Sequence, residues 1–136
     1  MRIATLLTSH NRRSKTIASL EGVFSQKLPD GCTMEVFLVD DGSDDGTGEA
    51  VRHRFPRVHL LEGTGELFWS GGMRMAFTEA LKGDYDFYWW VNDDTQLSSD
   101  ALDRMVQTYF TLTERSERPP VIVGSVCDPQ SGELTY

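Results

Sequence analysis

The sequence predicts an α/β protein with a three-layer, Rossmann-like fold around a mainly parallel sheet. Short apolar runs alternate along the chain with segments whose apolar residues recur at helical spacing. Turn-forming residues, such as those at positions 29–31, separate the two kinds of segment. Two of the apolar runs stop at a pair of aspartates, which is typical of a buried strand that ends at a loop. This alternation favours parallel strands covered by helices on both faces.

The strands are predicted from apolar runs of four to six residues. Turn and cap residues follow the first run at positions 9–11, and two prolines precede the last run at positions 119–120. Residues 128–132 are typical of a turn, after which a further strand is expected to begin at residues 133–136. The predicted strands are residues 3–8, 34–39, 58–61, 86–91 and 121–126.

Helices are predicted between these strands. Ile17, Leu20 and Val23 recur at helical spacing after the first strand. Residues 63–72 are expected to form a glycine-punctuated loop before the third helix. The predicted helices run from the loop after the first strand to about residue 28, from Asp44 or Asp45 to Arg54, from Met73 to Leu81, and from Ser98 or Ser99 to about Leu112.

Composition limits the classes of function. The 136 residues suffice for one domain, and a net charge of −8 argues against nucleic-acid binding. No apolar stretch approaches the ~20 residues of a membrane span, and no signal peptide is visible. Cys32 and Cys127 are far apart in sequence, which favours two reduced thiols in a cytosolic protein.

Two acidic pairs carry the main functional signal. Asp40-Asp41 follows the second apolar run, and Asp93-Asp94 follows the fourth. If both strands belong to one parallel sheet, the two pairs lie at its carboxyl edge, where open α/β sheets bind ligands. Four carboxylates at one edge repel one another unless a cation lies among them. The pattern therefore indicates a metal and phosphate chemistry.

Several common phosphate and metal motifs do not fit. Gly42, Gly46 and Gly48 lack the G-x-G-x-x-G spacing, and there is no Walker lysine and no G-x-S-x-G elbow. An EF-hand starting at Asp41 would need a glutamate at its twelfth position, where Arg52 stands. The second acidic pair has the wrong spacing for the D-x-D-x-T motif of phosphatases with an aspartate nucleophile.

Residues 8–12, 39–47 and 92–95 follow the first, second and fourth predicted strands. Together they closely resemble the nucleotide-sugar-binding half of the inverting glycosyltransferases of family 2, which have the GT-A fold. The W-x-N-D-D-T form at residues 90–95 and residues 68–72 look most like the bacterial rhamnosyltransferase-like branch of that family. The resemblance implies transfer of a sugar from a UDP- or dTDP-linked donor, with rhamnose as one candidate, to a glycan or lipid-linked acceptor with inversion. It places the protein in the cytoplasm, including the inner face of the plasma membrane, and in bacterial cell-surface polysaccharide synthesis.

The resemblance also assigns roles on the nucleotide side. Asp41 would accept the ring N–H of a uracil or thymine base. Asp40 would hold the loop or the ribose, although capping of a helix explains it equally well. Thr8 would contact the nucleotide partly through its backbone. Asn11 and Arg12 could serve the nucleotide, and simple capping explains Asn11 equally well.

The remaining roles concern the phosphates and the sugar. Asp94 matches the second acid of the family's D-x-D motif, so it would bind Mg²⁺ or Mn²⁺ and is the one residue assigned to catalysis. Asn92 replaces the first acid, which weakens the expectation of tight metal binding without nucleotide, and Asp93 would contact the ribose or sugar. Gly71 and Gly72 would let the backbone approach the ligand, Arg74 could meet a phosphate, and Trp69 could flank the base or sugar. The aromatic residues at positions 87–90 are expected in the sheet core.

The whole chain, residues 1–136, is expected to be a single donor-binding domain that is truncated after about the fifth strand, with the acceptor half absent. In similar enzymes the catalytic base lies beyond that strand, and Asp128 is a poor match for it. The chain alone is therefore expected to bind nucleotide but to transfer sugar poorly. A non-catalytic nucleotide-binding module and a nucleotidyltransferase with a GT-A-like sheet remain open alternatives.

Overall fold

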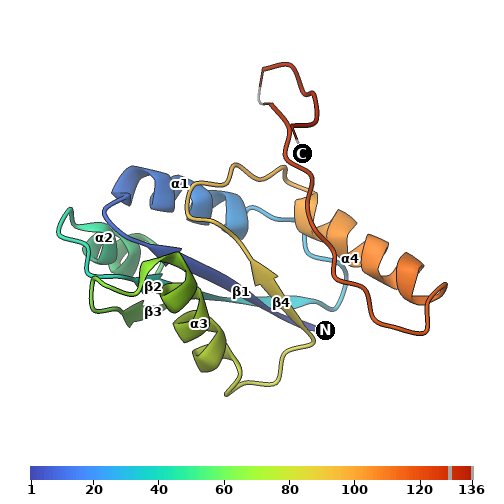
Figure 1. Cartoon of the computed structure of the whole chain (residues 1–136), viewed down its shortest axis with the longest axis horizontal. Coiled ribbons are helices and arrows are strands. Elements are labelled where there is room, and N and C mark those ends of the chain that lie inside the picture. Colours follow the sequence, from blue (N-terminus) through green and yellow to red (C-terminus); the bar gives the residue numbers. More distant parts are fainter. Residues whose placement is uncertain (129, 136) are drawn as a thin grey trace.

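The computed structural model describes residues 1–128 and 130–135 of the chain. Its centre is a four-stranded sheet in which every strand pair is parallel, with the strand order β3-β2-β1-β4 (Figure 1). The elements in chain order are β1 (Arg2–Ser9), α1 (Arg13–Phe24), β2 (Thr33–Asp40), α2 (Thr47–Arg54), β3 (His59–Glu62), α3 (Phe68–Ala80), β4 (Phe87–Trp90) and α4 (Ala101–Thr113). The predicted α/β fold with a parallel central sheet is confirmed.

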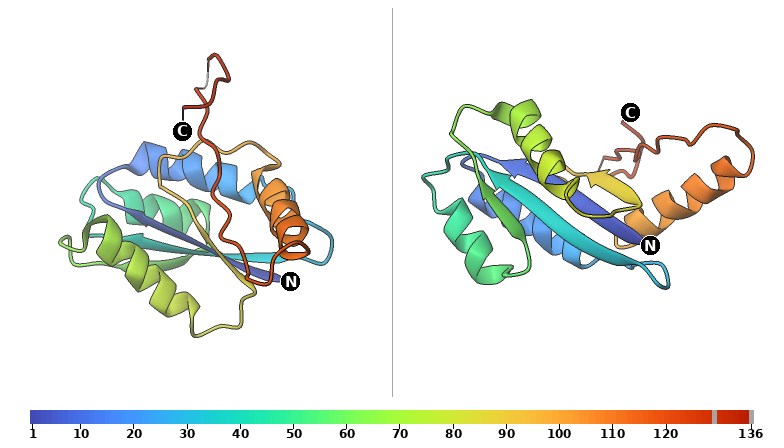
Figure 2. Two further views of the ribbon diagram at one scale, coloured as in Figure 1. Left: turned by 45° about the vertical axis from the view of Figure 1, so that its right-hand side comes forward. Right: turned by 90° about the horizontal axis from the view of Figure 1, so that it is seen from below.

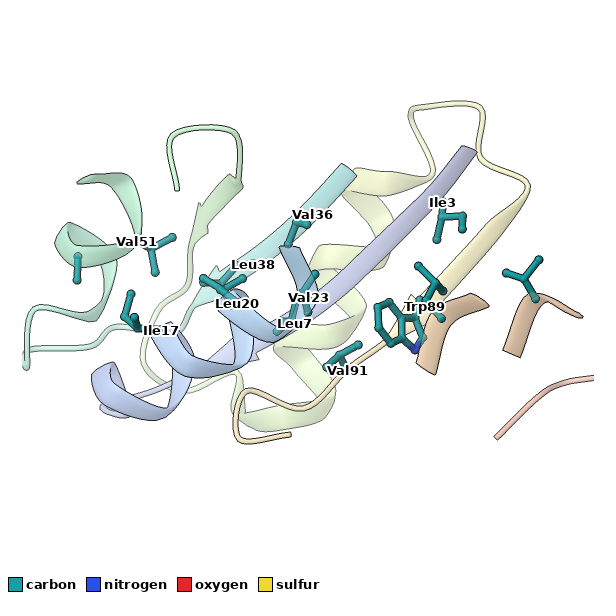
Figure 3. Packing of buried hydrophobic residues seen from close by; sticks show 13 residues of the cluster. Ile3, Leu7, Ile17, Leu20, Val23, Val36, Leu38, Val51, Trp89 and Val91 are labelled. Carbon is teal, nitrogen blue, oxygen red and sulfur yellow. The ribbon is translucent and has the colours of Figure 1, made fainter. Parts of the chain in front are cut away.

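Helices cover both faces of the sheet, which buries the central strand β1 on both sides. Ile3 and Leu7 of β1 pack with α1, α2 and α4 on one face, and Figure 3 shows the side chains of this larger cluster. Ala4 and Leu6 point to the other face, where α3 supplies the covering residues (Figure 2). Alternate residues of one strand thus serve two cores, as the pleat of a strand requires.

The register of the sheet brings the ends of the strands to one edge. Ser9 at the end of β1 pairs with Asp40 of β2, and Asp40 pairs with Glu62 of β3. On the other side, Leu6 of β1 pairs with Trp90, the last residue of β4. The loops that follow β1, β2 and β4 therefore leave the sheet at the same edge, as expected from the two acidic pairs.

Helix α3 starts at Phe68 and not at Met73, so half of the expected glycine-punctuated loop is helical. Gly72 inside this helix is buried against the side chain of Thr8 in β1, and a Cβ at position 72 would lie 2.7 Å from the Thr8 Cβ. Glycines that sequence reasoning assigned to a loop thus let a helix lie close to the sheet.

The expected fifth strand does not form. Residues 121–126 have no regular structure, and Val121 and Val123 are 90% and 84% exposed. The chain turns back after α4 (Figure 1), and within the described residues this run pairs with no strand, so the outer edge of β4 stays unpaired. Beyond it, Cys127 and Leu134 form an isolated antiparallel bridge around the expected turn. Of the strand expected at residues 133–136, the last residue lies outside the described part.

Smaller differences concern the ends of helices. Helix α1 ends at Phe24 and not near residue 28, and α4 begins after Asp100, so neither Ser98 nor Ser99 caps it. Helix α2 has Gly46 at its N-cap position, while the Asp45 carboxylate accepts hydrogen bonds from the backbone N–H and the hydroxyl of Thr47. None of the helices in the described ranges is both long and apolar enough to cross a membrane.

We expect Gly72→Ala to lower the free energy of unfolding by about 1–3 kcal/mol, because the new methyl group overlaps the Thr8 side chain. Gly22→Ala is the matched control, since it also lies within a helix but has its nearest neighbour atom at 3.8 Å. The control should be neutral or slightly stabilising. Urea unfolding of both variants measures the difference, and equal stabilities would show that α3 is not held at this close contact.

Candidate functional site

The candidate site lies at the carboxyl edge of the sheet, where four loops meet. Three of them follow β1, β2 and β4, and the fourth, residues 63–67, leads from β3 into α3. Side-chain contacts join them: Arg12 to Asp94, Asn11 to the loop after β2, and Asp41 to the loop before α3. The residues that the sequence placed at one edge are therefore brought together.

Asp41 is the most constrained residue of the site. Its side chain is buried, with the residue 3% exposed. Oδ1 accepts the backbone N–H of Gly65 at 2.7 Å, and Oδ2 accepts those of Leu67 at 2.9 Å and Phe68 at 3.0 Å. Phe68 begins α3, so the carboxylate also lies at the positive end of that helix. Asp41 thus holds the loop before α3 against the end of β2.

This role of Asp41 was not visible in the sequence. The carboxylate expected to accept a base N–H already accepts three backbone N–H groups, and its contact with a base stays a prediction. The signal that could have revealed the role is the pair of glycines at positions 63 and 65. Gly65 has φ +88°, and a Cβ on Gly42 would lie 2.8 Å from the Gly65 Cα, so the two loops touch through backbone atoms.

The side chain of Asp40 points away from the loop before α3. Its Oδ1 accepts the backbone N–H of Ser43 at 3.3 Å, and its Oδ2 lies where a Cβ at Gly48, near the start of α2, would collide with it. The sequence left open whether Asp40 holds the loop or the ribose, or caps a helix. These contacts favour the role in which Asp40 holds the loop after β2.

The loop after β1 is tied to the loop after β2 through Asn11. Asn11 has φ 50°, its backbone N–H donates to the Ser43 hydroxyl at 2.9 Å, and its Oδ1 accepts the backbone N–H of Asp44 at 2.8 Å. Asn11 therefore bridges two loops and does not cap α1, whose N-cap residue is Arg12 without a side-chain cap bond. In the loop after β2, hydrogen bonds from the Thr47 hydroxyl and from the Arg13 backbone N–H lower the pKa of Asp45.

The loop after β4 divides its side chains between the two faces of the sheet. Asn92 points toward α3, where its Oδ1 accepts the indole N–H of Trp69 at 3.0 Å. Asp93 and Asp94 point toward α1, where one guanidinium nitrogen of Arg12 donates to both of them. The Ser19 hydroxyl of α1 donates to the Asn92 backbone carbonyl at 3.1 Å and fixes the loop itself.

The glycines and the arginine of α3 differ in exposure. Gly72 is buried against Thr8, and a Cβ at Gly71 would lie 3.1 Å from the Leu67 Cβ, so both glycines serve packing. Arg74 is exposed and forms no ion pair within the part of the chain that the structure describes. Its contact with a phosphate stays a prediction.

One expectation about the aromatic residues at positions 87–90 is wrong. Trp89 is buried, but Trp90 is 49% exposed and lies beside Trp69, with ring centroids 6.1 Å apart. Trp69 itself is 53% exposed. Because β4 is one of the two edge strands and α3 packs mainly on β1 and β2, the second indole of the run remains at the surface.

Comparison with known proteins identifies relatives of this arrangement. The sequence model of the family "Glycosyl transferase family 2" matches residues 5–113. No curated protein matches the sequence.

Among solved structures, the chain is similar to the mannosyltransferase PcManGT from Pyrobaculum calidifontis in complex with GDP-Man and Mn²⁺, with a TM-score of 0.73 and 22% identity over 96% of this chain and 36% of that one. It is also similar to S. aureus TarS 1-349 in complex with UDP-GlcNAc, with a TM-score of 0.66 and 18% identity over 84% of this chain and 32% of that one. At these identities the likeness shows the fold, and the chain spans about a third of the length of both structures.

We expect Asp41→Asn to lower the free energy of unfolding by about 2–3 kcal/mol, because an amide loses the charge and can turn a donor toward backbone N–H groups that are already donors. Asp44→Asn is the matched control, since Asp44 is exposed and its carboxylate accepts no hydrogen bond from the described residues. Urea unfolding without any ligand checks this. A loss no larger than that of the control would mean that the three bonds to Asp41 do not hold the loop.

Proposed function

Because the chain belongs to glycosyl transferase family 2, we propose that it binds the nucleotide-diphospho-sugar donor of an inverting sugar-transfer reaction. The observation that carries the proposal is the meeting of the loops after β1, β2 and β4 at one edge, with Arg12 between Asp93 and Asp94. Ligands of open α/β sheets bind at this edge. A UDP- or dTDP-linked sugar, with rhamnose as one candidate, and a glycan or lipid-linked acceptor are the substrates we propose.

The nucleotide would lie along the loops after β1 and β2, beside the side chains of Asn11 and Asp40. The side chain of Thr8 is buried against α3, so only its backbone would be offered to the nucleotide. Asp41 supports this surface by fixing the adjoining loop, in addition to any contact with a base. The diphosphate is an anion in a protein of net charge −8, so it needs local positive charge. Arg12 and Arg74 are the candidates, since guanidinium groups match phosphate oxygens.

A divalent metal fits Asp94, although the protein supplies few ligands. The Asp94 side chain is 40% exposed, and only its Oδ2 is engaged by a described residue. Within the described residues no group of three or more His, Cys, Asp or Glu side chains could hold a metal ion. Mg²⁺ or Mn²⁺ would thus be held by Asp94 together with the donor's phosphates. When bound, the metal would stabilise the charge on the departing diphosphate.

The proposed reaction is a direct displacement at the anomeric carbon. An acceptor hydroxyl attacks, loses its proton to a carboxylate base, and the bond to the nucleotide diphosphate breaks. Asp128 is badly placed to be that base, because its carboxylate accepts the backbone N–H groups of Ser131 and Gln130 in the turn at the end of the tail, and these bonds lower its pKa. We therefore propose that this chain alone binds donor and transfers sugar slowly.

Thermal unfolding with UDP, dTDP and GDP and their sugars, each with and without Mn²⁺, tests the proposal. A true ligand at a hundred times its Kd should stabilise the chain by about 2.7 kcal/mol. We expect protection by a uridine or thymidine diphosphate, strengthened by Mn²⁺, and loss of the Mn²⁺ effect in Asp94→Asn.

The control for this experiment is Asp30→Asn, an exposed acid in the loop before β2, at the opposite edge of the sheet. It should retain both the protection and its dependence on Mn²⁺. Absence of protection by every nucleotide would refute donor binding. Equal Mn²⁺ dependence in Asp94→Asn and in Asp30→Asn would remove Asp94 from the metal site.

A further inference from the structure

Arg12 lies between the two acids of the loop after β4. Its Nη1 donates to Asp94 Oδ2 at 2.8 Å and reaches Asp93 Oδ1 at 3.4 Å. The Asp93 side chain is 9% exposed, whereas those of Arg12 and Asp94 are 47% and 40% exposed. One half-exposed cation therefore serves a buried and a half-exposed carboxylate.

This arrangement leaves the acids short of partners. The second oxygen of Asp93, Oδ2, is buried and has no hydrogen-bond partner within the described chain. A buried carboxylate oxygen without a partner is costly, so Asp93 depends on the positive charge of Arg12. Arg12 is also the one basic side chain that pairs with Asp93 or Asp94 among the described residues.

We propose that Arg12 guards Asp94 against divalent cations until an anion draws the guanidinium away. A cation at Asp94 must displace or tolerate the guanidinium that lies 2.8 Å from the carboxylate, and two neighbouring positive charges repel each other. Phosphate oxygens bind a guanidinium through paired hydrogen bonds and compete with Asp94 for it. Metal and diphosphate then bind cooperatively, and each raises the affinity for the other by the same factor. The exchange, in which Arg12 leaves Asp94 for a phosphate, rests on the proposed function.

The guard is tested with Mn²⁺ alone, by electron paramagnetic resonance of the free ion during titration of the ligand-free chain. We expect Arg12→Gln to raise the affinity for Mn²⁺ by about fivefold, the scale of a partly exposed ion pair. Arg12→Lys keeps the charge and should raise it less. Arg13→Gln is the matched control, because Arg13 is the neighbouring residue and pairs with neither acid in the described structure. Equal affinities of the wild type and Arg12→Gln would overturn the guard.

A second pair of variants decides the question if Arg12→Gln does not fold, since that change leaves Asp93 buried without its cation. Asp93→Asn removes the buried charge, and Asp93→Asn with Arg12→Gln removes the guanidinium as well. The double variant should bind Mn²⁺ about threefold more tightly than Asp93→Asn. Equal affinities of these two variants would also overturn the guard.

The exchange is tested by repeating the Mn²⁺ titrations with UDP at saturation. UDP should raise the Mn²⁺ affinity more in the wild type than in Arg12→Gln, because the variant has no guard to release. The same factor in both proteins would overturn the exchange and leave the proposed function intact. If UDP binds neither protein by calorimetry, the titration is repeated with dTDP. If neither nucleotide binds, the proposed function and the exchange both fail, and the titrations with Mn²⁺ alone still decide the guard.

Discussion

The carboxylate of Asp41 fixes the geometry on which the candidate site depends. It is buried at the end of β2 and accepts backbone N–H groups from the loop before α3 and from the first residue of that helix. These bonds join the sheet to the helix that covers one of its faces, while Gly72 lets the same helix lie against Thr8. Asp41 therefore holds the backbone of the loop before α3 in place at one side of the candidate site.

The fold could be predicted from the sequence because its signals are local and repeated. The two apolar runs that end in acids, at residues 34–39 and 86–91, correspond to β2 and β4. Burial on both faces of the sheet explains the continuous apolar run of β2, whereas β4 is an edge strand whose Trp90 stays half exposed. Two of the predictions that were wrong, the start of α3 and the fifth strand, depend on tertiary contacts. Gly72 lies in a helix that packs closely on the sheet, where Thr8 leaves no room for a Cβ, and residues 121–126 do not pair with the free edge of β4.

The site was predictable in its location and less so in the contacts of its residues. The ends of the predicted strands placed Thr8, Asp41 and Asp94 at one edge, and the register shows that β1, β2 and β4 end there. The partners of each side chain depend on loop geometry, which spacing along the chain does not encode. The bonds of Asp41 to the loop before α3 and the contact of Arg12 with Asp94 join residues that are more than 20 and 80 positions apart.

The three tryptophans allow changes at the candidate site to be followed by circular dichroism and fluorescence. Trp89 is buried in the core, whereas Trp69 and Trp90 are half exposed with neighbouring rings, and Trp69 is anchored to Asn92. Two indoles this close exchange excitation energy, and their combined circular dichroism depends on the angle between the rings. A movement of the beginning of α3 relative to β4 would therefore change the spectrum without any added label, while the emission of Trp89 would follow global unfolding.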